Sequence, residues 1–291
     1  MAEITIAGIM RSGAFSPNHI GHDAAIFNSV AEQLRKRGCV VNIYSEEEFC
    51  SGAVNERFIL AMCREKRSVE RLQELEDAGA LVINSGYGIE NCTRERMMRI
   101  FTGSEIAFPE SIAASTNEGV RTALNRLKIS RCWIKRGDAP TMHKEDVTFV
   151  RHAEEAQEVL QEFFLRGIQR AVISRHVEGR LVKFYGVAGT DFFLCVLPQE
   201  DTLAKYGFEG SSMRNVSAPP FDIQAIRSLC ARAADTLDIK IYGGDCIITP
   251  EGTPVIVSFN DWPSFAPCRT EAAPVIARLV MSSIRKKLKG V

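Results

Sequence analysis

The first hundred residues alternate short apolar runs with amphipathic segments, and this order constrains the fold more than any other feature of the chain. Residues 4–9, 40–44 and 80–85 are rich in Ile and Val, which predicts three strands. The segments between them have the apolar period of helices, the second over about 56–76. Strands joined through helices form parallel sheets covered on both faces. This part therefore predicts a Rossmann-like α/β lobe.

After Phe108 and Pro109 the order changes, because strands follow one another with fewer helices between them. Such an order favours α+β lobes with mainly antiparallel sheets. We therefore predict an α/β plus α+β fold in three parts, with boundaries at residues 1–107, 108–178 and 179–291.

Composition excludes several classes of protein. Lys+Arg and Asp+Glu both number 36, so no net field favours nucleic acid or an anionic membrane as a partner. No apolar run has the length of a membrane span. The nine cysteines are odd in number and never form a CxxC pair, which indicates reduced thiols. The sequence starts with a predicted strand and not with a signal peptide, so we expect a cytoplasmic protein. A homo-oligomer is compatible with the sequence.

A polar hairpin is predicted over residues 241–265, with a turn at 250–253. If the turn closes the hairpin symmetrically, Asp245 pairs with Ser258. Asn260 then lies on the same face, because side chains alternate along a strand. A carboxylate and an amide oxygen together are plausible ligands for Mg²⁺. The alternative is a surface hairpin with a solvated polar side.

Three cationic side chains lie in or beside predicted strands. Lys135 ends the apolar run CWIK, Lys183 lies within RLVKFYGV, and Arg96 follows the third strand. A lysine in a strand is costly to desolvate unless it meets an anion. Structural ion pairs would also explain each residue singly. Together with a metal-binding hairpin, however, such cations meet the needs of phosphoryl transfer, which relies on positioning and charge neutralisation.

Four segments follow one another in the order INSGYGIENCTRERMMRIF, CWIK, AVISRHVEGRLVKFYGV and DCIITPEGTPVIVSFNDWPSF. In these segments and in its element order, the chain resembles the ATP-grasp superfamily. That resemblance implies a Rossmann-like N-terminal lobe and two α+β lobes that clasp ATP, and it covers nearly the whole chain. It is nearest to D-alanine–D-alanine ligases, glutamate-adding ligases and inositol-polyphosphate kinases.

The resemblance implies a role for residues in each segment. Cations would hold the ATP phosphates, the interlobe hinge would hold adenine and ribose, and the hairpin would hold Mg²⁺. The residues that bind the phosphates would be Arg96, Lys135 and Lys183, and Lys183 would also be catalytic. The hinge residues would be His176, Val177 and Glu178, and the metal ligands would be Asp245 and Asn260.

The loop after the first strand is a predicted substrate site, because ligands of parallel sheets bind beyond the carboxyl ends of the strands. It carries Arg11, Ser12, Ser16 and His19, and the resemblance adds Arg269 as a further acceptor or catalytic residue. An ordinary solvated loop is the alternative.

At Ser258 the chain departs from the superfamily pattern, which has a bridging carboxylate there. A unit charge pair at about 4 Å contributes roughly 4 kcal/mol at an effective dielectric of 20, or about a thousandfold in rate. Asp261 is expected on the opposite face, so it would not compensate.

The leading prediction is an ATP- and Mg-dependent ligase. It would join small-molecule or peptide carboxylate and amine substrates through an acyl phosphate. The alternatives are a small-molecule kinase and a weakened nucleotide-binding regulatory protein; the first shares the nucleotide site and the second is suggested by Ser258.

Overall fold

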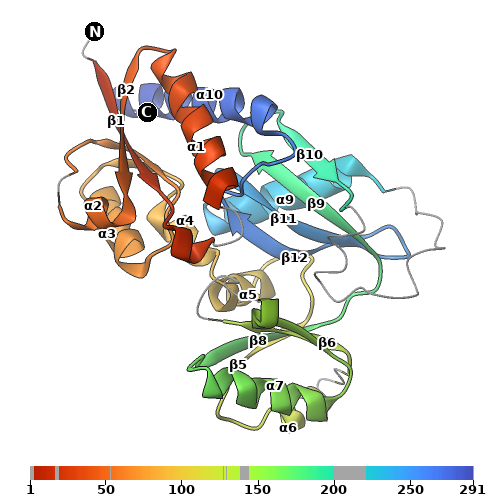
Figure 1. Cartoon of the computed structure of the whole chain (residues 1–291). Helices are drawn as coiled ribbons and strands as arrows, with labels where there is room; N and C mark the ends of the chain where they lie inside the picture. Colours follow the sequence, from red (N-terminus) through yellow and green to blue (C-terminus); the bar gives the residue numbers. More distant parts are fainter. Residues whose placement is uncertain are drawn as a thin grey trace.

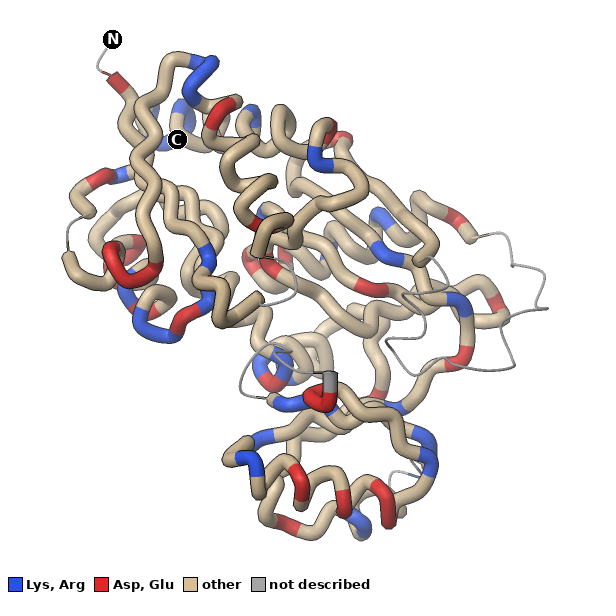
Figure 2. Tube along the Cα trace, viewed as in Figure 1, with Lys and Arg blue, Asp and Glu red and all other residues tan. Residues whose placement is uncertain are grey.

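The computed structural model describes residues 3–16, 20–52, 54–126, 128, 130–137, 144–198 and 221–290, which build three four-stranded sheets (Figure 1). The sheets have the orders β2-β1-β3-β4, β5-β8-β6-β7 and β10-β9-β11-β12. The predicted combination of an α/β lobe with α+β lobes is therefore confirmed. No described helix is long and apolar enough to cross a membrane. Basic and acidic positions are interspersed in all three lobes (Figure 2).

The first sheet is parallel throughout. Its strands are β1 (Ile4–Met10), β2 (Cys39–Ser45), β3 (Phe58–Ala61) and β4 (Leu81–Ile83). Its helices are α1 (Ile20–Arg35), α2 (Glu46–Cys50), α3 (Lys66–Asp77), α4 (Gly86–Asn91) and α5 (Arg94–Thr102), with a 3₁₀ turn at Gly13–Phe15.

The predicted helix over 56–76 is wrong in its first half. Residues 58–61 form the strand β3, which pairs with both β1 and β4, and the helix begins only at Lys66. Ile59, Leu60 and Ala61 are buried, because a strand inside the sheet is covered on both faces. A short apolar run of this kind has no period that distinguishes a strand from a buried helix.

The second sheet is antiparallel and builds a lobe that we call the lid lobe. Its strands are β5 (Ser111–Ser115), β6 (Cys132–Arg136), β7 (Val147–Val150) and β8 (Arg170–Arg175). Its helices are α6 (Arg121–Arg126) and α7 (Ala153–Leu165), with a 3₁₀ turn at Lys144–Asp146. Among the described residues, its buried core lies within the lobe, from Ala114 to Ile173.

The third sheet is also antiparallel and carries the predicted hairpin. Its strands are β9 (Arg180–Val187), β10 (Phe193–Val196), β11 (Ile241–Ile248) and β12 (Pro254–Asp261). Its helices are α9 (Ile223–Leu237), which packs on one face, and α10 (Arg269–Leu288).

The first and third lobes share their cores. In Figure 1 α10 runs beside α1, and one buried cluster contains Ile26 and Phe27 of α1 with Ile276 and Val280 of α10. The buried amide of Asn84 joins the lobes again. Its Nδ2 donates to the Ile241 carbonyl at 2.8 Å, and its Oδ1 accepts from the Ile241 N–H at 2.8 Å. Two segments far apart in sequence thus form one packed unit.

The connection between β8 of the lid lobe and β9 of the third sheet depends on Gly179. Its φ is +145°, and an added Cβ would lie 2.1 Å from the carbonyl oxygen of Ile248. We therefore expect Gly179→Ala to lower the free energy of unfolding by at least about 2 kcal/mol in urea denaturation. Gly252→Ala is the matched control, because Gly252 has φ +83° with open space around it and should cost about 1 kcal/mol. Equal losses would contradict the steric explanation.

Candidate active site

The hairpin has the predicted register. Asp245 on β11 pairs with Ser258 on β12, and Asn260 lies two residues further on the same face. Nδ2 of Asn260 donates to Oγ of Ser258 at 3.1 Å. Cys246 pairs with Ile256, so Val257 is an extra residue that forms a β-bulge beside this polar face.

Lys183 meets the hairpin from the neighbouring strand. It lies opposite Asp245 in the β9–β11 pairing, and its Nζ donates to Oδ1 of Asp245 at 2.8 Å. Side-chain exposure is 24% for the lysine and 14% for the aspartate, so the pair is largely shielded from water. The alternation of β9 thus places a cation beside the candidate metal ligand.

Lys135, on β6 of the lid lobe, contacts the same hairpin. Its Nζ donates to the carbonyl oxygen of Val257, the bulge residue, at 3.1 Å. Burial and the charge of Arg94 lower the pKa of Lys135 to about 8, and the charge of Asp245 opposes this shift. The structure therefore brings Lys135 and Lys183 together with Asp245 from three different strands in two lobes.

Arg94, and not the predicted Arg96, is the arginine beside this cluster. Nη1 of Arg94 donates to the carbonyl oxygen of Arg136, next to Lys135. Arg96 is half exposed, with Nη1 2.9 Å from Glu90 and Nε donating to Asn91. Residues two apart on a helix face different directions, so the segment RER alone could not distinguish them.

The predicted hinge residues follow β8. His176 accepts a hydrogen bond on Nδ1 from Nε1 of Trp133 at 3.1 Å, and burial lowers its pKa. Glu178 pairs with Arg131 and lies 3.7 Å from Nε2 of His176. Val177 lies between them and is partly buried. The predicted adenine and ribose residues are thus in one short segment where the lid joins the third lobe.

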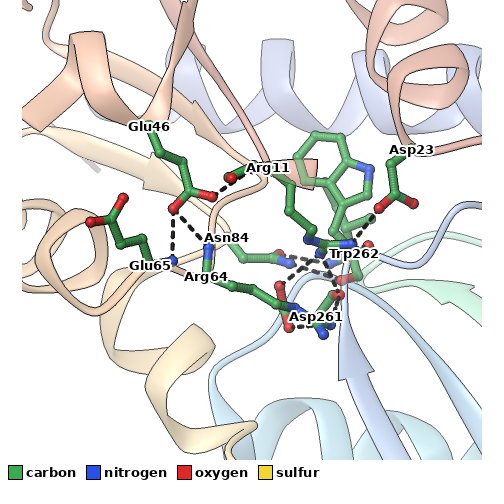
Figure 3. Close-up of polar contacts among 10 residues, drawn as sticks. Arg11, Asp23, Glu46, Arg64, Glu65, Asn84, Asp261 and Trp262 are labelled. Atoms are coloured by element: carbon green, nitrogen blue, oxygen red, sulfur yellow. Dashed lines mark hydrogen bonds and ion pairs between the residues drawn. The ribbon is translucent and has the colours of Figure 1, made fainter. Parts of the chain in front are cut away.

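Arg11 has a different environment from the open loop that the sequence predicts. Its guanidinium is buried, with Asp23 at 3.0 Å and Asp261 at 3.4 Å (Figure 3). It also donates to the Trp262 carbonyl at 3.1 Å, and Arg64 lies 2.9 Å from Asp261. Asp261 is therefore on the face opposite Asp245, as predicted. Two carboxylates already offset the charge of Arg11.

Glu46 was missed by the sequence analysis. Its carboxylate accepts hydrogen bonds from the N–H groups of Ser12 at 2.8 Å, Arg64 at 3.1 Å and Glu65 at 2.7 Å (Figure 3). It is 2% exposed and fixes the loops that leave the carboxyl ends of β1 and β3. Because it is the first of three consecutive glutamates, nothing in the sequence distinguishes it.

The other predicted acceptor residues lie near Arg11. Ser12 and Ser16 line a small hollow with apolar walls that include Met10 and Phe27. Nη2 of Arg269, at the start of α10, is 3.2 Å from Nδ1 of His22 on α1. His19 lies outside the described residues.

The hairpin oxygens fit one Mg²⁺ ion. Within the described ranges, no cluster of three or more acidic, histidine or cysteine side chains could hold a metal. Oδ1 of Asp245 accepts from Lys183, and Nδ2 of Asn260 donates to Ser258, so neither Oδ2 of Asp245 nor Oδ1 of Asn260 takes part in these two bonds. A carboxylate and an amide oxygen suit Mg²⁺, which often takes few protein ligands and completes its shell with phosphates and water.

Solved structures of ligases share this architecture, although no protein-family model and no curated protein sequence matches the chain. The D-alanine–D-alanine ligase of Bacillus anthracis complexed with ATP has a TM-score of 0.71 at 12% identity, with 100% of both chains covered. The VanG D-Ala:D-Ser ligase of Enterococcus faecalis has a TM-score of 0.70 at 13% identity, covering 98% of this chain and 99% of that chain. The ATP-grasp ligase PsnB, complexed with minimal precursor, Mg and ADP, has a TM-score of 0.62 at 13% identity, covering 97% and 99%.

Proposed function

The chain has the ATP-grasp fold, and from this premise we propose that it is an ATP- and Mg-dependent ligase that joins a carboxylate to an amine. The observation that carries the proposal is the meeting of Lys135, Lys183 and Asp245 between the lid and third lobes. Two shielded ammonium groups beside one carboxylate are suited to a polyphosphate with a bound cation.

In this proposal each group has a distinct role. Lys135, Lys183 and Arg94 bind the ATP phosphates. Asp245 and Asn260 hold Mg²⁺, which neutralises phosphate charge when bound. The hinge residues His176, Val177 and Glu178 bind adenine and ribose.

The reaction consists of two displacements. A carboxylate oxygen of the first substrate attacks the γ-phosphorus, the bond to the β-phosphate oxygen breaks, and ADP leaves. The amine of the second substrate then attacks the carbonyl carbon of the acyl phosphate, phosphate leaves, and the amine loses a proton. Ser12, Ser16, His19 and Arg269 bind these substrates in the proposal, while Arg11 positions the loop through its ion pairs.

The test has two stages. We expect ATP and ADP to raise the thermal unfolding temperature, with a larger rise when Mg²⁺ is present. We then expect ADP release only when both a carboxylate and an amine are supplied, in a panel of amino acids and dipeptides. A stable phosphorylated product would favour a kinase in place of a ligase.

Ser258 favours a second candidate, a nucleotide-binding regulator with weak turnover. This candidate predicts ATP binding without ADP release with any acceptor, and a gain of turnover in Ser258→Glu. Rapid turnover by the wild-type protein would exclude it. Absence of any nucleotide-dependent shift would exclude both candidates.

Nucleotide binding should be coupled to proton uptake at Lys135. Its pKa of about 8 means that roughly half of these side chains are neutral at pH 8 in the free protein. A bound phosphate favours the ammonium form, so we expect uptake of roughly half a proton per nucleotide at pH 8 and almost none at pH 6. Calorimetry in buffers of different ionisation enthalpy measures this number. Lys135→Arg should abolish the uptake, because its guanidinium stays charged; uptake that persists in this variant would assign the proton to another group.

A further inference from the structure

We infer that this site binds one divalent cation for each bound triphosphate, and that Ser258 determines this number. The inference deepens the proposed function and rests on the nucleotide site described there. It follows from the ligands on the hairpin face, their hydrogen bonds and the surrounding charges.

The described hairpin face supplies oxygens for one cation. Asp245 is its one carboxylate among the described residues, and one of its two oxygens is already bonded to Lys183 at 2.8 Å. Asn260 contributes Oδ1, because its Nδ2 is bonded to Ser258. Two neighbouring oxygens of this kind are a typical protein share of one Mg²⁺ shell.

Ser258 is the position where a second cation would need its ligand. It lies directly opposite Asp245, so a carboxylate there could share its two oxygens between two ions. The hydroxyl of Ser258 has one oxygen and no charge, and it already accepts a hydrogen bond from Asn260 at 3.1 Å. Two divalent ions repel each other about four times as strongly as two unit charges at the same distance, and a neutral hydroxyl does not offset this repulsion.

Asp261 cannot replace the missing carboxylate. It is the next residue after Asn260, so it lies on the other face of β12, where Arg11 and Arg64 are within 3.4 Å and 2.9 Å. Turning it to the metal face would leave two buried guanidinium groups without this partner.

The cations beside the hairpin face also disfavour a second divalent ion. Nζ of Lys183 is 2.8 Å from Oδ1 of Asp245, and the buried Nζ of Lys135 donates to the carbonyl oxygen of Val257. A second ion would add two positive charges beside these ammonium groups in a shielded site, and the described hairpin face has no further carboxylate to offset them.

The number of ions can be counted directly with Mn²⁺. The protein is held in excess over the β,γ-methylene analogue of ATP, so that nearly all nucleotide is bound, and bound Mn²⁺ is measured by electron paramagnetic resonance during a titration. We expect about one Mn²⁺ per bound nucleotide in wild type. Ser258→Glu should bind about two.

Ser258→Ala is the matched control, because it also loses the contact to Asn260 but adds no carboxylate. It should bind one Mn²⁺ with weaker affinity, since Asn260 is no longer positioned. Two ions in wild type, or one in a folded Ser258→Glu, would overturn the inference while leaving nucleotide binding intact. If Ser258→Glu fails to fold, the wild-type count decides. Absence of nucleotide binding at any Mn²⁺ concentration would instead reject the proposed function itself.

Discussion

Lys135→Met is expected to lower the rate of ATP turnover by about a thousandfold while leaving the fold intact. A unit charge about 4 Å from a phosphate oxygen contributes roughly 4 kcal/mol at an effective dielectric of 20, and each 1.36 kcal/mol is about tenfold in rate. The partner of Lys135 is the neutral carbonyl of Val257, so the substitution leaves no opposite charge unpaired. Steady-state ADP release with saturating substrates measures the loss.

We expect Lys135→Met to be at least as stable as the wild-type protein, although it loses activity. Burial lowers the pKa of Lys135 from 10.5 to about 8, so the charged form is less favourable in the folded protein. Below pH 8 the folded state therefore carries a desolvation cost that a methionine would not, and we expect equal or greater resistance to urea at pH 7. Lys36→Met is the matched control, because Lys36 is 61% exposed and pairs with Glu32 on the outside of α1. A comparable loss of turnover in both variants would contradict the assigned role.

Asp261→Ala is expected to lower the free energy of unfolding by about 3–5 kcal/mol. Its carboxylate is 4% exposed and contacts both Arg11 and Arg64, whose charges would remain buried without it. Removing one partner of a buried ion pair has a cost of this size. Arg11 keeps Asp23 at 3.0 Å, but Arg64 loses this carboxylate at a largely buried position. Urea denaturation followed by circular dichroism measures the difference.

Asp191→Ala provides the comparison for an exposed pair. Asp191 is fully exposed and lies 3.1 Å from Arg227, so its loss should change the free energy of unfolding far less than the loss of Asp261 does. If Asp261→Ala were as mild as this control, the network in Figure 3 would not hold the first and third lobes together.

Strand alternation and turn signals in the sequence were enough to predict several features of the site. The register of Asp245 with Ser258 follows from the turn and the two-residue alternation of strands. The position of Asp261 on the other face follows from the same alternation. The lysines at 135 and 183 were recognisable because each lies in an apolar strand.

Features that depend on contacts between distant segments could not be predicted in this way. Glu46 is one of three glutamates in a row, and only the folded chain brings the N–H groups of Ser12 and Arg64 to it. Arg94 and Arg96 differ in which side of α5 faces the lid, and this depends on how α5 packs. The sequence likewise could not show that Asp23 and Asp261, which lie in other elements, offset the charge of Arg11. Tertiary packing, and not local propensity, decided these cases.

The core that α1 shares with α10 determines when the N-terminal lobe can be completed during synthesis. Domains usually fold in the order in which they leave the ribosome. Here the part of α1 that packs on α10 remains uncovered until α10 has been translated, whereas the described core of the lid lobe lies wholly within that lobe. The lobe that contains α1 therefore reaches its final packing only after the whole lid lobe has been translated, and over that interval it offers an apolar surface that a chaperone can bind.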